Sequence, residues 1–431
     1  MKKKSYLLAS AFLLLAFGGI ACSKKSETVD PVVDNKITEV PTITQAAVNE
    51  PTKPTEPVKE EEPTVTPLPT FEPSKPDEVD RSEAFRILED MNVGWNLGNT
   101  LDAINESNPR MAETAWGNPE TTKEMIDAIH DQGFNTIRIP ITWSGHVGEA
   151  PEYKIDSVWM DRVQEIVDYG MDNEMYVIID THHEPNTWLV PTMENYDKVQ
   201  EQLCAIWQQI AERFADYNEK LIFEGMNEPR VKGSSQEWSG GTQDNRKAIN
   251  RLNVDFIRTV RNAGGNNDKR ICIITTNGGS VTENTIKELY LPNDPYMMVA
   301  VHLYTPYFFT FDVPDQGYTN WDGSQKGDIE YMMRLLDNHL ISKGVPVIIT
   351  EFGAVNKTMI VDGQETTNES DVLAWLKDYM TETNKYGIKC IWWDNGNYSE
   401  DGERFGIFDR RNLTWFSQNI ADALIENATQ E

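Results

Sequence analysis

The run LIFEG at residues 221–225 is followed directly by Met226-Asn227-Glu228-Pro229. The run is short and mostly apolar, without strict alternation, which is typical of a strand that is buried on both faces. Polar residues begin where the run ends. Seven other stretches have the same character, and they occupy residues 92–97, 136–141, 175–180, 270–275, 298–303, 345–351 and 389–393.

Amphipathic stretches separate these predicted strands. Apolar residues recur with helical spacing at residues 156–172, 196–216, 242–263, 327–342 and 371–386. Repeated β-then-α units over about 350 residues predict an α/β fold, a (β/α)8 TIM barrel, which we place at residues 81–431. The alternative is an open doubly wound sheet. It is disfavoured because Gly94-Trp95-Asn96-Leu97-Gly98 does not match the glycine-rich phosphate loop of such sheets.

The first 80 residues differ from the rest. Lys2, Lys3 and Lys4 precede a short apolar run and Cys22, which predicts a lipoprotein-type signal peptide at residues 1–21 with lipidation of Cys22. Residues 22–80 are rich in Pro, Thr and Glu, and this composition predicts a disordered linker. We therefore expect an exported protein, either anchored to the cell surface through Cys22 or, with ordinary cleavage near Ala21, secreted.

The charge and the cysteines exclude several classes of function. The formal net charge is −30, which argues against binding to nucleic acid or to anionic lipid. Cys204, Cys272 and Cys390 have no metal-ligand spacing, and we expect buried apolar residues there. The stretch from His183 to Thr187 begins like a zinc-protease motif but lacks the second histidine. We expect no metal, no cofactor and a monomer.

Polar side chains gather at the carboxyl ends of the predicted strands, where barrel enzymes place their active sites. Two carboxylic acids, Glu228 and Glu351, end the fourth and seventh strands. Cleavage of a glycosidic bond needs one acid to protonate the leaving oxygen and a second carboxylate to attack or to activate water. The two carboxylic acids fit this chemistry. The other polar residues at these ends are Arg138, His182, His183, Asn227, His302, Tyr304 and Trp393.

Several motifs resemble those of glycoside hydrolase family 5, and the resemblance covers about residues 84 to 428. Residues 221–229 resemble its acid/base motif and residues 348–353 its nucleophile motif. Residues 94–102, with Asn99, resemble the opening of its bacterial endoglucanases. The resemblance implies that Glu228 is the general acid/base and Glu351 the nucleophile of a retaining reaction. For this chemistry we expect a raised pKa for Glu228 and a low pKa for Glu351.

The resemblance also implies substrate-binding roles. Asn227 would bond the sugar 2-hydroxyl, and Trp393 would stack on the sugar next to the scissile bond. Arg138 and Tyr304 would contact Glu351, although an ion pair of purely structural kind remains open for Arg138. His182, His183 and His302 would orient the sugar hydroxyls and the acid/base.

Other residues near the predicted site are more ambiguous. We interpret Glu224 as a buried structural partner and Trp392 as packing, because strand alternation turns Trp392 away from Trp393. Trp116 resembles part of a glucan-binding segment. The aromatic residues of the stretch 307–321 fit either sugar stacking or packing of a long loop, and they are Tyr307, Phe308, Phe309, Phe311, Tyr318 and Trp321.

The lead hypothesis for function is an endo-β-1,4-glucanase acting on cellulose-type chains. The alternatives with the same machinery are action on xyloglucan or mixed-linkage glucan and, less favoured, on mannan. A carbohydrate-binding lipoprotein without activity is disfavoured because every expected catalytic residue is present. An isomerase or aldolase barrel would need a phosphate site or a Schiff-base lysine, and the eight strand ends offer no lysine.

Overall fold

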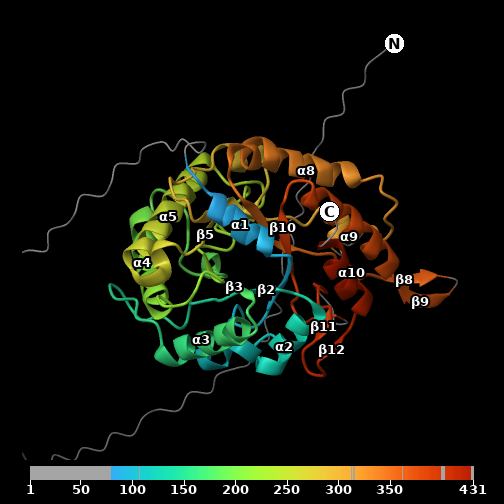
Figure 1. Cartoon of the computed structure of the whole chain (residues 1–431), viewed down its shortest axis with the longest axis horizontal. Helices are drawn as coiled ribbons and strands as arrows, with labels where there is room; N and C mark the ends of the chain where they lie inside the picture. The colour runs from blue at the N-terminus through green and yellow to red at the C-terminus, as the bar shows by residue number, and fades with distance from the viewer. Residues whose placement is uncertain are drawn as a thin grey trace, which may run out of the picture. The chain divides into compact units, whose positions relative to one another are not determined.

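The computed structural model describes residues 79–428 except 106, 312, 314–315, 362 and 399–402. Eight parallel strands close a barrel in the order β1-β10-β7-β6-β5-β4-β3-β2 (Figure 1). Every predicted strand is present, so the TIM-barrel prediction is confirmed. The barrel strands are β1 Val93–Asn96, β2 Thr136–Ile139, β3 Tyr176–Asp180, β4 Leu221–Glu224, β5 Cys272–Thr275, β6 Met297–His302, β7 Val347–Phe352 and β10 Lys389–Trp392.

Helices surround the barrel (Figure 1). The five predicted helices are observed as α3 Ser157–Asp172, α4 Tyr196–Arg213, α5 Gln243–Asn262, α8 Lys326–His339 and α9 Glu369–Asn384. Elements that we did not predict also occur. They are α1 Ser82–Asp90, α2 Lys123–Gln132, α6 Glu283–Lys287, α7 Tyr307–Thr310, α10 Gln418–Ala428, the hairpin of β8 Thr358–Val361 with β9 Gln364–Thr367, and the pair β11 Phe408–Asp409 with β12 Thr414–Trp415.

Strand alternation divides the core into two layers. Outward-facing residues such as Phe223 pack against the surrounding helices. Inward-facing residues such as Ile222 fill the barrel together with the apolar face of α1, which lies across one end of the barrel (Figure 1). The rows of apolar residues are continuous because both faces of each strand are covered.

One irregularity in β7 matters for the site. Val301 of β6 pairs with Ile349 of β7, whereas the next residue, His302, pairs with Glu351, so β7 holds one extra residue at this point. Such a bulge breaks the strict alternation of side chains. As a result, Thr350 and Glu351 both face the barrel interior, where they contact Glu224 and Arg138 respectively.

The predicted signal peptide, Cys22 and nearly all of the predicted linker belong to residues 1–78, which lie outside the described residues. The domain boundaries therefore stay predictions. Among the residues that are described, no helix is both long and apolar enough to span a membrane. Cys272 and Cys390 are buried and Cys204 is half-buried, and all three thiols are free.

Candidate active site

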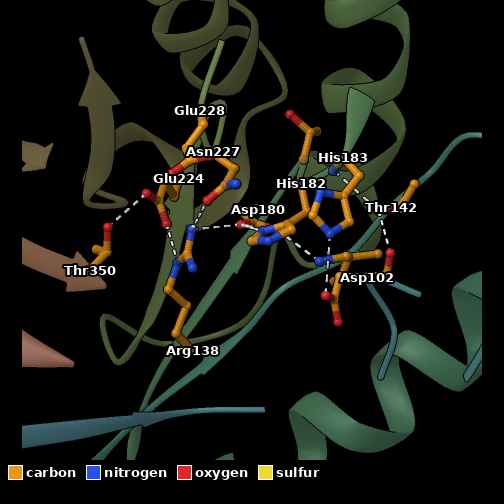
Figure 2. Close-up of polar contacts among 12 residues, drawn as sticks. Asp102, Arg138, Thr142, Asp180, His182, His183, Glu224, Asn227, Glu228 and Thr350 are labelled. Carbon is orange, nitrogen blue, oxygen red and sulfur yellow. Dashed lines mark hydrogen bonds and ion pairs between the residues drawn. The ribbon is translucent and has the colours of Figure 1, made fainter. Parts of the chain in front are cut away.

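Arg138, at the end of β2, is the centre of a buried polar cluster (Figure 2). Its guanidinium donates hydrogen bonds to Glu224 at 2.6 Å, Asp180 at 2.8 Å and Glu351 at 2.9 Å. It also donates to the Asn227 side-chain oxygen at 2.7 Å. The planar guanidinium has five N–H donors in a fixed fork, so one side chain orients these four partners and also Asn96, whose side-chain oxygen accepts at 3.1 Å.

The charges in this cluster are strongly coupled. One positive side chain faces three carboxylates, and the side chains of Arg138, Asp180 and Glu224 are fully buried. Burial raises the pKa of Asp180 to about 6 even though Arg138 acts in the opposite direction. Removing Arg138 would therefore leave buried carboxylates without compensation, which proteins tolerate poorly.

Glu351 lies at the end of β7, next to the bulge. Its Oε1 accepts from Arg138, and its Oε2 accepts from the Tyr304 hydroxyl at 3.1 Å. His302 Nδ1 lies 3.3 Å from the same Oε2. Three groups, one from β2 and two from the end of β6 and the residues after it, thus fix the orientation of this carboxylate.

Glu228 lies just beyond the end of β4. Its Oε1 lies 2.8 Å from His302 Nδ1, and its Oε2 lies 3.3 Å from Arg230. The nearest carboxylate oxygens of Glu228 and Glu351 and the His302 ring nitrogen all lie within 4.8 Å of one another. Retaining glycosidases hold their two carboxyl groups about 5 to 5.5 Å apart, and inverting enzymes need a wider gap for water. The spacing observed here fits retention.

The pKa values of the two glutamates in this ligand-free site are the reverse of our expectation. Burial would raise the pKa of Glu228, but His302 and then Arg230 outweigh burial and lower this pKa to about 2. For Glu351, burial outweighs His302 and Arg138, so its pKa is raised above 4.5. Burial disfavours charge on His302 as well, yet Glu351 and Glu228 raise its pKa. In the free site, His302 and Arg230 thus favour the ionised form of Glu228, and the two glutamates favour the charged form of His302.

The histidine pair at the end of β3 is held by two aspartates. His182 Nδ1 lies 2.7 Å from Asp180, and His183 Nε2 lies 3.5 Å from Asp102 (Figure 2). The His182 ring lies parallel to the Trp393 ring with centroids 5.8 Å apart. Burial lowers the pKa of His182 well below its usual value, so this ring is neutral at pH 7.

Trp393 and Trp116 differ in exposure. Trp393 is almost buried, and a Cβ placed on Gly98 would lie 2.8 Å from its ring, so glycine is required there. Trp116 is 44 % exposed, and its ring centroid lies 5.5 Å from that of His183. Asn99 is half-buried next to Gly98, with a left-handed φ of 54°.

The two structural interpretations agree with the observed contacts. Glu224 is buried against Arg138 and Thr350, and Trp392 is buried and donates to the Phe405 carbonyl. The aromatic residues of the stretch 307–321 differ in exposure. Phe309 and Trp321 are buried, Tyr307 and Phe308 are exposed, Tyr318 is half-buried, and Phe311 packs against Tyr304 with ring centroids 5.0 Å apart.

Two groups of described residues have the geometry to hold a metal ion, namely Asp102 with His182 and His183, and Glu228 with His302 and Glu351. In the second group the carboxylates already accept from Arg138, Tyr304 and Arg230. These donors satisfy the carboxylates without a cation, and hydrolysis by two carboxylates requires none.

Comparison with known proteins decides the family. The model of the cellulase family, glycosyl hydrolase family 5, matches residues 101–399. The chain belongs to glycoside hydrolase family 5. It is 49 % identical over 353 residues to Endoglucanase A of Ruminococcus albus, covering 81 % of this chain and 94 % of that protein.

Solved structures of the same family are also similar. A xyloglucan-specific endo-β-1,4-glucanase, XEG5A from a metagenomic library, in complex with cellotriose, is 49 % identical, with a TM-score of 0.76 and coverage of 80 % of this chain and 99 % of that one. A broad-specificity endoglucanase from Ruminococcus champanellensis, with bound cellotriose, is 42 % identical, with a TM-score of 0.75 and coverage of 81 % and 99 %.

Several residues of this family 5 site were not found from the sequence. Asp180 was treated only as the last residue of a strand, although its place at the carboxyl end of the barrel, which we call the mouth, could have marked it as a site residue. Asn96, which accepts from Arg138 at 3.1 Å, had the same signal. Arg230 and Glu403 lie in loops, and nothing in the sequence pattern marked them. Glu403 is near enough to Glu351 and Glu228 that their charges, after burial, raise its pKa.

Proposed function

We propose that this protein is an endo-acting, retaining β-1,4-glucanase, a cellulase that hydrolyses internal bonds of cellulose-type glucans. The observation that carries this proposal is the close pair of Glu228 and Glu351 at the barrel mouth, with carboxylate oxygens within 4.8 Å. The family 5 relatives named endoglucanases support the substrate class.

The first step forms a bond between Glu351 and the sugar. The ionised Glu351 carboxylate attacks the anomeric carbon, the glycosidic C–O bond breaks, and Glu228 gives a proton to the departing oxygen. Arg138 and Tyr304 hold Glu351 in place for attack. His302 Nδ1 lies 2.8 Å from Glu228 Oε1, so His302 is placed to pass a proton to Glu228 before this step.

The second step releases the sugar. Glu228, now ionised, takes a proton from water, and the oxygen of that water displaces Glu351 from the anomeric carbon. Two inversions give a product with the original β configuration. The contacts of His302 and Arg230 to Glu228 stabilise its ionised form, which is the form needed in this step.

Neighbouring side chains would bind the sugar. The Asn227 oxygen accepts from Arg138, which leaves its NH₂ group to donate to the sugar 2-hydroxyl. Trp393 offers a ring for stacking beside the scissile bond, and His182 and His183 supply polar contacts that Asp180 and Asp102 orient.

The second candidate is preference for xyloglucan or for mixed-linkage glucan, and mannan is less favoured. Among the similar structures, one is named a xyloglucan-specific endo-β-1,4-glucanase. Another is named a lichenase, from Caldicellulosiruptor, at 37 % identity and a TM-score of 0.75.

The decisive experiment compares initial rates on soluble cellulose, mixed-linkage glucan, xyloglucan and mannan side by side. The highest kcat/KM on cellulose would support the main proposal, and the highest on xyloglucan or mixed-linkage glucan would favour the second candidate. Proton NMR of early product should show the β-anomer, since an α-anomer first would exclude retention. Rates should not change in EDTA.

We further propose that the protein is exported by a bacterial cell, lipidated at Cys22 and anchored to the cell surface, and that it acts as a monomer with its linker spanning residues 22–80. The support is the basic and apolar start of the sequence followed by Cys22. Expression of the full chain and of Cys22→Ala in a bacterial host tests the anchor. The parent should stay with the membrane and Cys22→Ala should be released, while equal partition of both would contradict lipidation.

Size-exclusion chromatography with light scattering tests whether the protein is a monomer.

A further inference from the structure

Arg230 connects Glu228 to an exposed tryptophan. Its Nη1 donates to the Glu228 carbonyl at 2.9 Å and lies 3.3 Å from Glu228 Oε2. Its Nε donates to Glu237 at 3.1 Å, and its guanidinium carbon lies 4.2 Å from the Trp238 ring centroid. A cation so close to an indole face is a favourable contact. One nearly buried guanidinium thus contacts both the carboxylate and the ring.

The loop that carries Trp238 is held firmly. The Gly233 N–H donates to Glu237 at 2.7 Å, and the Gly278 N–H donates to the Pro229 carbonyl at 2.9 Å. A Cβ placed on Gly278 would lie 3.9 Å from the Trp238 ring, so the ring lies alongside the turn that follows β5. Even so, Trp238 is 49 % exposed. Part of this held ring is therefore open to contact with a ligand.

The position of Trp238 indicates which part of a glucan it would meet. In the barrel order, β4 stands directly opposite β10, the strand that Trp393 follows. A glucan chain with one sugar at Trp393 and its scissile oxygen at Glu228 therefore continues toward the loop after β4. Because Glu228 protonates the leaving oxygen, the sugars on this side belong to the leaving group.

We propose that Trp238 is a stacking platform for the sugars on the leaving-group side, and that Arg230 is a positioning residue that fixes both this ring and Glu228. The proposal rests on the proposed glucanase function and deepens it. Arg230 then serves the first step in two ways. Its guanidinium holds the ring that binds the departing sugar, and it orients Glu228, which protonates that sugar.

Arg230 also contributes charge to the site. Its loss would destabilise the ionised form of Glu228, so the proton shared in the site would be held to higher pH. The alkaline side of the pH profile of kcat/KM reports loss of that proton, and it should move upward. The other titratable groups that act on or respond to Glu228 are His302 from β6, Tyr304 after β6, Glu351 from β7, His182 and His183 after β3, and Glu403 after β10.

The platform is tested with Trp238→Ala and Trp238→Phe on two substrates. Cellohexaose has sugars on the leaving-group side, whereas β-cellobiosyl fluoride has none. Trp238→Ala should lower kcat/KM about tenfold on cellohexaose and leave the fluoride within about twofold of wild type. Trp238→Phe should lie between Trp238→Ala and wild type on cellohexaose. Equal losses on both substrates, or no loss on either, would overturn the platform.

The positioning role is tested with Arg230→Met and Arg230→Lys on cellohexaose. The alkaline limb should move to higher pH in Arg230→Met and stay near that of wild type in Arg230→Lys, which keeps the charge. Arg334→Met removes an exposed arginine that pairs with Glu330 on α8 and should leave the limb in place. An unmoved limb in folded Arg230→Met would overturn the role. If Arg230→Met does not fold, a shifted limb in Arg230→Lys would overturn it instead. A wild-type protein that cleaves neither substrate would refute the proposed function itself.

Discussion

The two ends of the barrel are built from the same eight strands and have opposite character. At the carboxyl ends, Arg138, Asp180 and Glu224 are buried as charged or polar groups around Glu351. At the other end, Ile87 and Leu88 of α1 close the barrel with apolar contacts. In barrels of this kind, catalytic groups belong to the first end and stability to the second. The contrast teaches that each strand contributes to stability at its amino end and to the chemistry of the site at its carboxyl end.

The polar end opposes folding. Burying charged groups costs several kcal/mol per ion, and their mutual attraction offsets this cost only when the geometry is good. The five hydrogen-bond partners of Arg138 supply that geometry. A purely structural reason for this cluster is therefore weak, and its contact with Glu351 fits the role of orienting the catalytic pair that we propose.

The largest expected effect is at the mouth. Glu351→Ala should lower kcat on soluble cellulose by at least about 10⁴-fold, because the covalent step loses its nucleophile. Binding of cellotetraose, measured by calorimetry, should persist. Glu330→Ala removes an exposed carboxylate on α8 and serves as the control, with unchanged kcat. Substantial turnover by Glu351→Ala would reassign the nucleophile.

The next effect is on pH dependence. Glu351 must be ionised to attack, and burial raises its pKa above 4.5, so kcat/KM should fall as the pH drops through that raised value.

His302 opposes the upward shift in the pKa of Glu351. His302→Phe removes this positive neighbour, and the acid limb should move to still higher pH, with a loss of rate of about 10²-fold or more for the missing proton donor. An acid limb that stays in place would show that His302 carries no charge in the free enzyme.

The strand ends explain how much the sequence revealed. Apolar runs predicted the barrel, and the polar and aromatic residues at the carboxyl ends of those runs predicted that Glu228, Glu351, Arg138 and Trp393 gather at one end of it. The bulge in β7 was not predictable, because it depends on pairing with β6 and not on local pattern. The lowered pKa of Glu228 follows from its closeness to His302 and the raised pKa of Glu351 from its burial, and no spacing along the chain encodes either.

Side chains in loops were harder still, because loop backbone has no period from which a direction can be inferred. Arg230 could be read as a surface charge after a Pro, and only the fold turns it toward Glu228. The amphipathic helix α1 was missed at the edge of the linker, although its buried apolar residues Ala84, Ile87 and Leu88 have helical spacing.

A smaller effect is expected at the rim of the mouth. Trp116→Ala should lower kcat/KM on soluble cellulose by about fivefold, the range for loss of one exposed stacking contact. Tyr331→Ala on α8 removes an aromatic residue of similar exposure, 51 % against 44 %, and should have no effect. Equal rates for Trp116→Ala and wild type would assign Trp116 to packing on His183.

The smallest effect on catalysis should come from the apolar end. Leu88→Ala opens a cavity where α1 meets the barrel interior, and we expect a loss of about 2 to 5 kcal/mol in the free energy of unfolding. Urea denaturation measures this loss, with the exposed Val158→Ala of α3 as a nearly neutral control. At temperatures where Leu88→Ala stays folded, its kcat/KM should equal that of wild type within about twofold, because the residues between α1 and Arg138 are close-packed and keep the mouth in place. A large loss of activity without unfolding would mean that the two ends are coupled, and the division between stability and chemistry would then fail for this barrel.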